Sequence, residues 1–97
     1  MTPDQILDRA ADLLERDGWQ RGEYGPRTLR GPRCVVGSLM AARGIDDYRP
    51  YDVAHSALKN EVGGGSLTIW NDEVVKDKRQ VIRTLRRTAR KLRGEKR

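Results

Sequence analysis

The most apolar run in this chain covers residues 32–44, Pro-Arg-Cys-Val-Val-Gly-Ser-Leu-Met-Ala-Ala-Arg-Gly, and the rest of the sequence is strongly hydrophilic. The apolar positions of the run follow helical spacing and not the alternation of a half-buried strand. Pro32 suits the first helical turn, where no amide hydrogen is needed, and Gly44 can end a helix in a left-handed conformation. The run therefore predicts a short buried helix around which the other elements pack.

The size and composition of the chain limit both its architecture and its chemistry. A chain of 97 residues forms one small domain, and 36% hydrophobic residues without phenylalanine leave a modest core. The single cysteine excludes an internal disulfide, and one cysteine with one histidine is too few for a zinc site. No apolar run approaches the ~20 residues of a membrane span, and no signal peptide precedes the first helix. We therefore expect a cytoplasmic protein that binds no cofactor, metal or membrane.

Two further helices are predicted on either side of the apolar run. The first helix is predicted at residues 3–17. Thr2 can cap it, Pro3 suits its first position, and Gln5 is placed to complete a capping box. Residues 50–62 carry one apolar face and precede a run of glycines that can end a helix. Both segments therefore have the length and the ends of ordinary surface helices.

A fourth, basic helix is predicted at residues 77–93, followed by a frayed tail at 94–97. Two starts compete, Asp72 and Asp77, and we favour Asp77 because Gln80 then completes a capping box. The apolar residues that follow recur at helical spacing and define one face for docking on the body.

Two short segments outside the helices predict strands. Residues 19–30 contain a Gly-Pro turn between two extended pieces, and residues 67–70 alternate in polarity. The predicted fold class is therefore mainly α: about four helices with a short two- or three-stranded β addition, in a single small helical domain of residues 1–97.

The positive charge of the chain is concentrated at its C-terminal end. Residues 76–97 carry 11 basic and 2 acidic side chains, whereas the preceding residues carry 9 basic and 12 acidic ones. An acidic body with a basic end favours an anionic partner. The arginines that recur at steps of three and four residues, and so share one stripe beside the apolar face, are Arg79, Arg83, Arg86, Arg90, Arg93 and Arg97.

This arginine stripe has three interpretations. A row of guanidinium groups can follow a phosphate backbone through charge-assisted hydrogen bonds, which favours nucleic acid. The same row could bind an acidic protein surface, or it could solvate an exposed helix near the negative end of its dipole. No aromatic residues alternate with the arginines and no helix-turn-helix pair is evident, so nucleic-acid binding would be weakly sequence-specific.

Cys34, His55 and the pair Asn71 and Asp72 follow the chain order of some cysteine hydrolases. A thiol near a helix N-terminus has a lowered pKa, so a small hydrolase is one hypothesis. We favour a structural interpretation, in which Cys34 is a buried apolar residue, His55 lies at the surface, and Asn71 and Asp72 cap a turn. Trp70 is expected to fill the core, and an exposed Trp70 would instead mark a binding patch.

Four motifs together resemble a known family. They are Ala-Ala-Asp-Leu-Leu-Glu at residues 10–15, Gly-Trp at 18–19, Cys-Val-Val-Gly-Ser-Leu at 34–39 and Trp-Asn-Asp at 70–72. The chain resembles an uncharacterised family, a domain of unknown function in small proteins of actinobacteria and their phages. Ser38 replaces the alanine usual in that family, and the closing helix is more basic here. The resemblance implies a fold and an actinobacterial or bacteriophage source, but no activity.

The sequence favours a non-enzymatic accessory or regulatory protein that binds an anionic partner through the arginine stripe, and the resemblance implies that a phage or an actinobacterium encodes it. Nucleic acid is the favoured partner. The alternative is a protein-binding module that modulates a host protein through a surface including Trp70 or the linker at residues 45–52. The third hypothesis is the small cysteine hydrolase.

Overall fold

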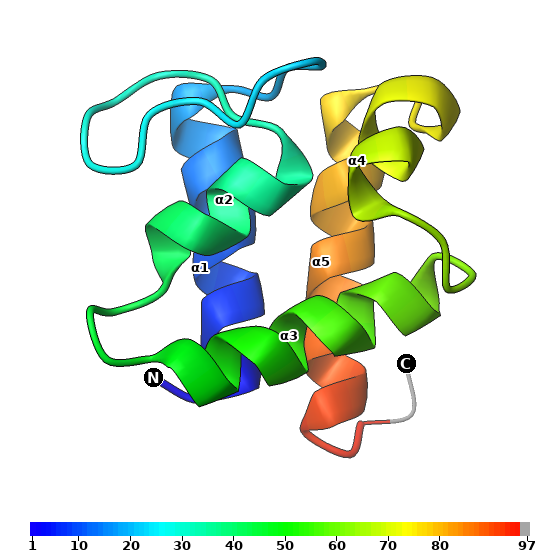
Figure 1. The fold of residues 1–97 in the computed structure, drawn as a ribbon. Helices are drawn as coiled ribbons and strands as arrows, with labels where there is room; N and C mark the ends of the chain where they lie inside the picture. The colour runs from blue at the N-terminus through cyan, green and yellow to red at the C-terminus, as the bar shows by residue number, and fades with distance from the viewer. Residues whose placement is uncertain (96–97) are drawn as a thin grey trace.

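A computed structural model of the chain describes residues 1–95, and these form helices joined by loops. Figure 1 shows the two longest helices side by side, with shorter elements crossing in front of them. The elements in chain order are α1 (Pro3–Asp17), α2 (Val35–Ala42), α3 (Tyr48–Glu61), α4 (Leu67–Ile69), the π-helix η1 (Trp70–Val74) and α5 (Lys78–Leu92).

The long helices α1 and α5 run antiparallel, because Arg93 at the end of α5 contacts Asp4 at the start of α1. Helix α2 packs on α1, and α3 packs across both long helices. The core lies between these layers. Its buried apolar residues are Ile6, Leu7, Ala10, Ala11, Leu13, Leu14, Cys34, Val35, Val36, Leu39, Ala42, Ala54, Leu58, Leu67, Trp70, Val75, Val81, Leu85 and Ala89.

The starts of the long helices confirm the predicted caps, although the Oε1 atom of Gln80 accepts from the amide of Lys76 and not from that of Asp77. The backbone amide of Thr2 donates to Gln5 Oε1 at 2.9 Å before α1. Asp77, and not Asp72, caps α5, because its Oδ1 accepts from the amide of Gln80 at 2.9 Å. These bonds satisfy amides that no preceding helical turn can reach.

The two middle helices differ from their predicted bounds. Helix α2 begins three residues after Pro32, because Arg33 is extended and forms an isolated β-bridge with Trp19. The Sγ atom of Cys34 then caps α2 by accepting from the amide of Gly37 at 3.4 Å. Helix α3 begins two residues before Pro50, which is tolerated because first-turn amides have no helical partner.

The predicted β addition at 19–30 and 67–70 is wrong. Within residues 1–95 the only extended pairing is the isolated bridge between Trp19 and residue 33. The loop that contains residues 20–32 satisfies its backbone through side chains instead, such as the amide of Gly22 on Asp72 Oδ1 at 3.0 Å. In the second segment the apparent alternation is one helical turn capped by Ser66, whose Oγ accepts from Ile69.

The π-helix η1 explains how residues 70–75 bury three side chains. The amide of Val75 donates to the carbonyl of Trp70 at 3.0 Å, five residues back. This wider turn brings Trp70, Asn71 and Val75 to the core, and it confirms the expected burial of Trp70.

Gly37 allows the loop between α1 and α2 to lie directly on α2. A side-chain carbon at this position would come within 1.8 Å of the carbonyl oxygen of Tyr24. The loop backbone is therefore in direct contact with the helix.

Among the helices described here, none has the length and hydropathy to cross a bilayer.

Candidate nucleic-acid interface

Helix α5 buries one face and divides its basic residues among the other three sides. The buried face carries Val81, Thr84, Leu85, Thr88 and Ala89. At about 100° per residue, Arg86 and Arg93 point toward α1, and Arg87 and Lys91 point toward α3. The remaining arginines of the stripe lie opposite the buried face.

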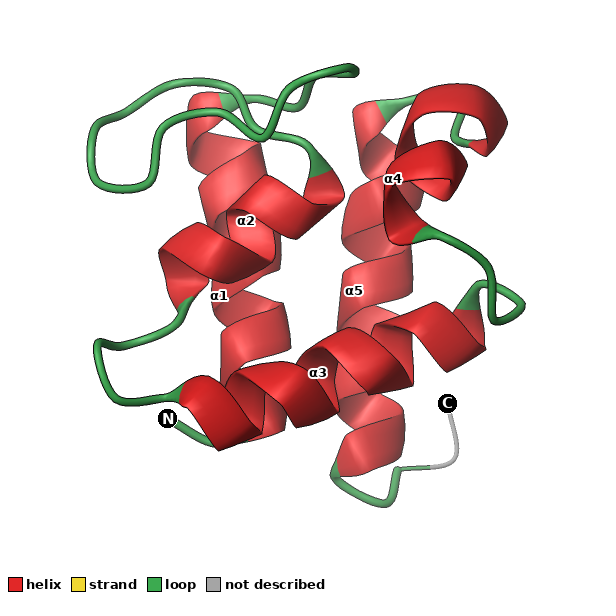
Figure 2. Ribbon diagram, in the orientation of Figure 1, coloured by secondary structure: helices red, strands yellow, loops and turns green. Residues whose placement is uncertain are grey.

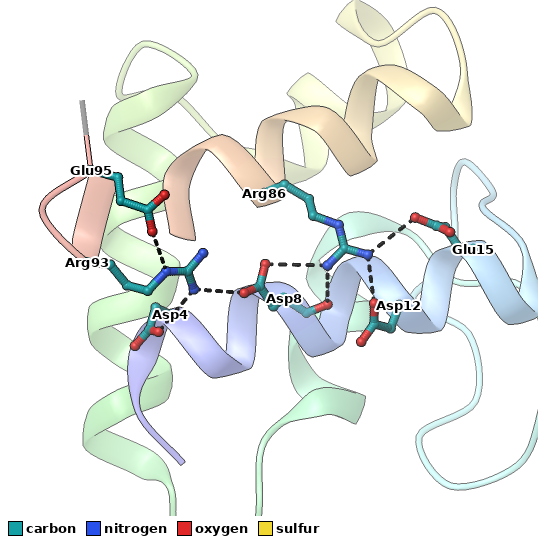
Figure 3. Close-up of polar contacts among 7 residues, drawn as sticks. All are labelled: Asp4, Asp8, Asp12, Glu15, Arg86, Arg93 and Glu95. Carbon is teal, nitrogen blue, oxygen red and sulfur yellow. Dashed lines mark hydrogen bonds and ion pairs between the residues drawn. The ribbon is translucent and has the colours of Figure 1, made fainter. Parts of the chain in front are cut away.

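The row toward α1 is paired with acidic side chains of that helix, as Figure 3 shows. Arg86 Nη2 donates to Asp12 Oδ1 at 2.7 Å, and Arg93 Nη1 donates to Asp8 Oδ2 at 2.8 Å. Asp4 accepts from the same nitrogen of Arg93 at 3.1 Å. The hydrogen bond to Asp8 raises the pKa of Arg93, and the one to Asp12 raises the pKa of Arg86. These two predicted site residues therefore hold α5 on α1.

The row toward α3 shares a single carboxylate. Arg87 Nε lies 2.7 Å from Glu61 Oε2, and Lys91 Nζ lies 2.9 Å from Glu61 Oε1. Burial opposes the charge of Glu61, but the hydrogen bonds from Lys91 and Arg87 lower its pKa. Helix α5 is thus fixed by ion pairs on both of its flanks.

The row opposite the core consists of Arg79, Arg83 and Arg90, which we call the outward ridge. Arg79 and Arg83 are exposed, and within residues 1–95 neither side chain makes a hydrogen bond or an ion pair. Arg90 is half-buried. Two surface hollows of about 370 and 350 Å³ adjoin the ridge and share Ile82 and Arg83 in their lining. Arg97, the last residue of the predicted stripe, lies outside the described residues.

The acidic partners on α1 were missed by the sequence analysis, although their spacing is visible there. These residues recur at steps of four, four and three, which places them on one side of a helix. A row with that spacing matches the basic row on α5 and signals a pair of helices joined by charge. Its members are Asp4, Asp8, Asp12 and Glu15.

The residues of the hydrolase hypothesis do not share one hollow. Cys34 and Asp72 line a hollow of about 320 Å³, whereas His55 lines a different one, of about 270 Å³. Burial raises the pKa of the Cys34 thiol, which is opposite to the effect expected from the helix dipole. The structure therefore gives no support for a thiolate at this position.

We expect the Cys34 thiol to react slowly with iodoacetamide at neutral pH. Because the thiol is buried and its pKa is raised, its alkylation should be about tenfold or more slower than in the urea-unfolded chain. Mass spectrometry at timed intervals measures both rates. Rapid alkylation that His55→Ala abolishes would contradict this expectation and support the hydrolase.

Asn71 and Asp72 have structural partners. Asn71 is fully buried, and its Oδ1 accepts from Trp19 Nε1 at 2.7 Å and from the amide of Val35 at 2.9 Å. Its Nδ2 donates to the carbonyl of Gln20 at 3.1 Å. Asn71 thus joins η1 to the start of α2 and to the loop that follows α1. Within residues 1–95 no group of acidic, cysteine or histidine side chains could hold a metal ion.

The linker of the protein-binding hypothesis carries exposed apolar side chains. Ile45 is 82% exposed and Tyr48 is 65% exposed. The guanidinium of Arg43 lies 4.8 Å from the centre of the Tyr48 ring, which holds the ring at the surface. Trp70, the other residue of that hypothesis, is buried and forms no surface patch.

Comparison with known proteins gives one family and no individual relative. Residues 1–91 match the model of a family described as a family of unknown function (DUF6197). No curated protein and no solved structure matched the chain. The predicted resemblance to a domain of unknown function is confirmed.

Proposed function

The chain belongs to DUF6197, a family of unknown function, and from the outward ridge of α5 we propose that this member is a non-enzymatic protein that binds nucleic acid. In this proposal Arg79 and Arg83 contact the phosphate backbone. The observation that carries the proposal is that Arg79 and Arg83 are exposed and have no partner within residues 1–95, although acidic residues are close enough to pair with the flanking rows.

The way in which α5 is held supports a backbone contact. Ion pairs to α1 and α3 fix the helix on both sides, so the ridge is presented in one orientation. From residue 79 to residue 90 the ridge extends about 16 Å along the helix. A guanidinium group can form paired hydrogen bonds with a phosphate, and the exposed Arg79 and Arg83 offer two such contacts along one edge.

The chemistry of the ridge also limits its specificity. Helix α5 contains no aromatic residue on which a base could stack. The acidic residues beside Arg86 and Arg93 reduce the positive field on the side toward α1. The proposal is therefore weak binding that depends on charge, as for a regulatory or accessory protein.

A second candidate function is a protein interaction through the linker at residues 45–52. The exposed Ile45 and Tyr48 favour it, because single apolar side chains grouped at a surface can anchor a partner. Such a complex would persist at salt concentrations that dissociate nucleic acid.

We expect the double variant Arg79→Gln/Arg83→Gln to weaken the salt dependence of duplex DNA binding. Removing two phosphate contacts should make the slope of log K against log salt less negative by about 2. Fluorescence anisotropy with a labelled duplex, measured from low to physiological salt, gives this slope.

The matched control is Arg49→Gln/Lys59→Gln, which removes the same charge from exposed positions on α3. Its slope should stay close to that of the wild type. The proposal fails if the wild type does not bind at low salt, or if both variants change the slope equally.

A further inference from the structure

The loop between α1 and α2 is held from inside by one buried arginine. Arg33 is 2% exposed, and its Nε donates to the carbonyl of Pro26 at 2.6 Å. Its Nη2 donates to the carbonyl of Leu29 at 2.7 Å. Both ends of the short segment 26–30 are therefore fixed to the body, and the segment has one defined shape.

The base of this loop has more positive than negative charge. Three guanidinium groups contact the single carboxylate of Asp17: Arg16 at 2.8 Å, Arg33 at 2.9 Å and Arg30 at 3.1 Å. The single negative charge of Asp17 balances only one of the three positive charges, and of the three arginines only Arg33 is buried. The side chains of Arg16 and Arg30 are 51% and 72% exposed, so the excess charge faces solvent.

The tip of the loop adds a third cation and an apolar group. Arg27 is exposed and makes no hydrogen bond or ion pair within residues 1–95. Leu29 is 74% exposed between Arg27 and Arg30, and no acidic residue occurs from 24 to 33. A leucine held at the surface by a buried arginine is not explained by packing of the core.

We propose that Arg16, Arg27 and Arg30, which we call the loop cluster, form a second contact with the nucleic-acid backbone, with Leu29 against the groove between the phosphates. This inference rests on the proposed function and extends it, because it assigns a duplex as the partner. Two separate cationic edges can engage the two strands that border a groove, and an apolar side chain beside arginines is a recurrent feature of groove binding.

The loop between α1 and α2 lies at the end of the molecule where α5 begins (Figure 1). Glu15, next to Arg16 in α1, lines the same hollow as Lys78 and Arg79 at the start of α5. A lipid surface is the weaker match, because Leu29 is the one large apolar side chain of segment 26–30 and stable membrane contact needs more buried apolar area.

The test uses the full chain and a labelled 20-base-pair duplex. The variant Arg27→Gln/Arg30→Gln keeps Arg33 and should make the salt slope less negative by about 2. Leu29→Ala should lower the affinity by about threefold or more with the slope unchanged, because it removes apolar contact and no charge. Circular dichroism melting verifies that both variants fold.

The outcomes separate this inference from the proposed function. If the loop variant binds with the wild-type slope while Arg79→Gln/Arg83→Gln does not, the loop cluster is excluded and the ridge stands. If only the loop variant changes the slope, the loop cluster stands and the ridge is excluded. Equal affinity for the duplex and for its single strand would overturn the duplex assignment. Binding to phosphatidylserine vesicles that requires Leu29, without binding to the duplex, would overturn the loop inference.

Discussion

Replacing Asn71 with alanine is expected to lower the free energy of unfolding by about 3–5 kcal/mol, because each buried polar group left unpaired costs about 1–3 kcal/mol. The variant removes the acceptor for Trp19 Nε1 and for the amide of Val35. It also removes the donor to the carbonyl of Gln20. The three groups belong to the segments where α1 ends and α2 begins, so the loss acts on the centre of the fold.

Urea titration followed by circular dichroism at 222 nm measures this change. Asn60→Ala is the control, because Asn60 is exposed and its side chain makes no hydrogen bond within residues 1–95. That substitution should change the free energy of unfolding by less than about 0.5 kcal/mol. Similar effects of the two substitutions would show that the Asn71 bonds are replaced by water.

The starts of the two long helices could be predicted because they depend on neighbouring residues. The bonds from Thr2 to Gln5 and from Gln80 to Asp77 each span three residues. Capping rules describe such local bonds directly.

The segment from 67 to 75 could not be predicted because its partners are distant in sequence. Asn71 bonds to Trp19, which is 52 residues away, and this contact decides which side of the segment is buried. A short run with apolar residues at 67, 69 and 70 fits a strand or a helix equally well. The π-turn that buries both Trp70 and Val75 has no sequence signal that we recognised.

In the candidate site, too, features set by neighbouring residues could be predicted and contacts between distant residues could not. The spacing of the arginines predicted which of them share a side of α5, but not their partners on other helices. Arg86 contacts Asp12, which is 74 residues away, while Arg79 has no such contact within residues 1–95. A comparison of the charge rows of the two long helices would have found the first pairing.

Replacing Arg33 with methionine is expected to lower the free energy of unfolding by about 3–5 kcal/mol, as is usual when one partner of a buried ion pair is removed. The side chain lies beneath the loop and contacts Asp17 and the carbonyls of Pro26 and Leu29. Methionine has a similar length but donates no hydrogen bond, so both carbonyls lose their partner.

Arg16→Met is the matched control, because Arg16 contacts the same Asp17 from the surface. Exposed ion pairs contribute about 1 kcal/mol or less, so this variant should remain close to the wild type in urea titrations. Amide hydrogen exchange adds a local readout, since Arg33→Met should accelerate exchange in residues 27–30 while Arg16→Met leaves it unchanged. If both variants lose the same stability, charge balance at Asp17 and not the buried contacts of Arg33 holds the loop. Equal exchange in the two variants would lead to the same conclusion, because the loop tip would then keep its shape without the hydrogen bonds that Arg33 donates.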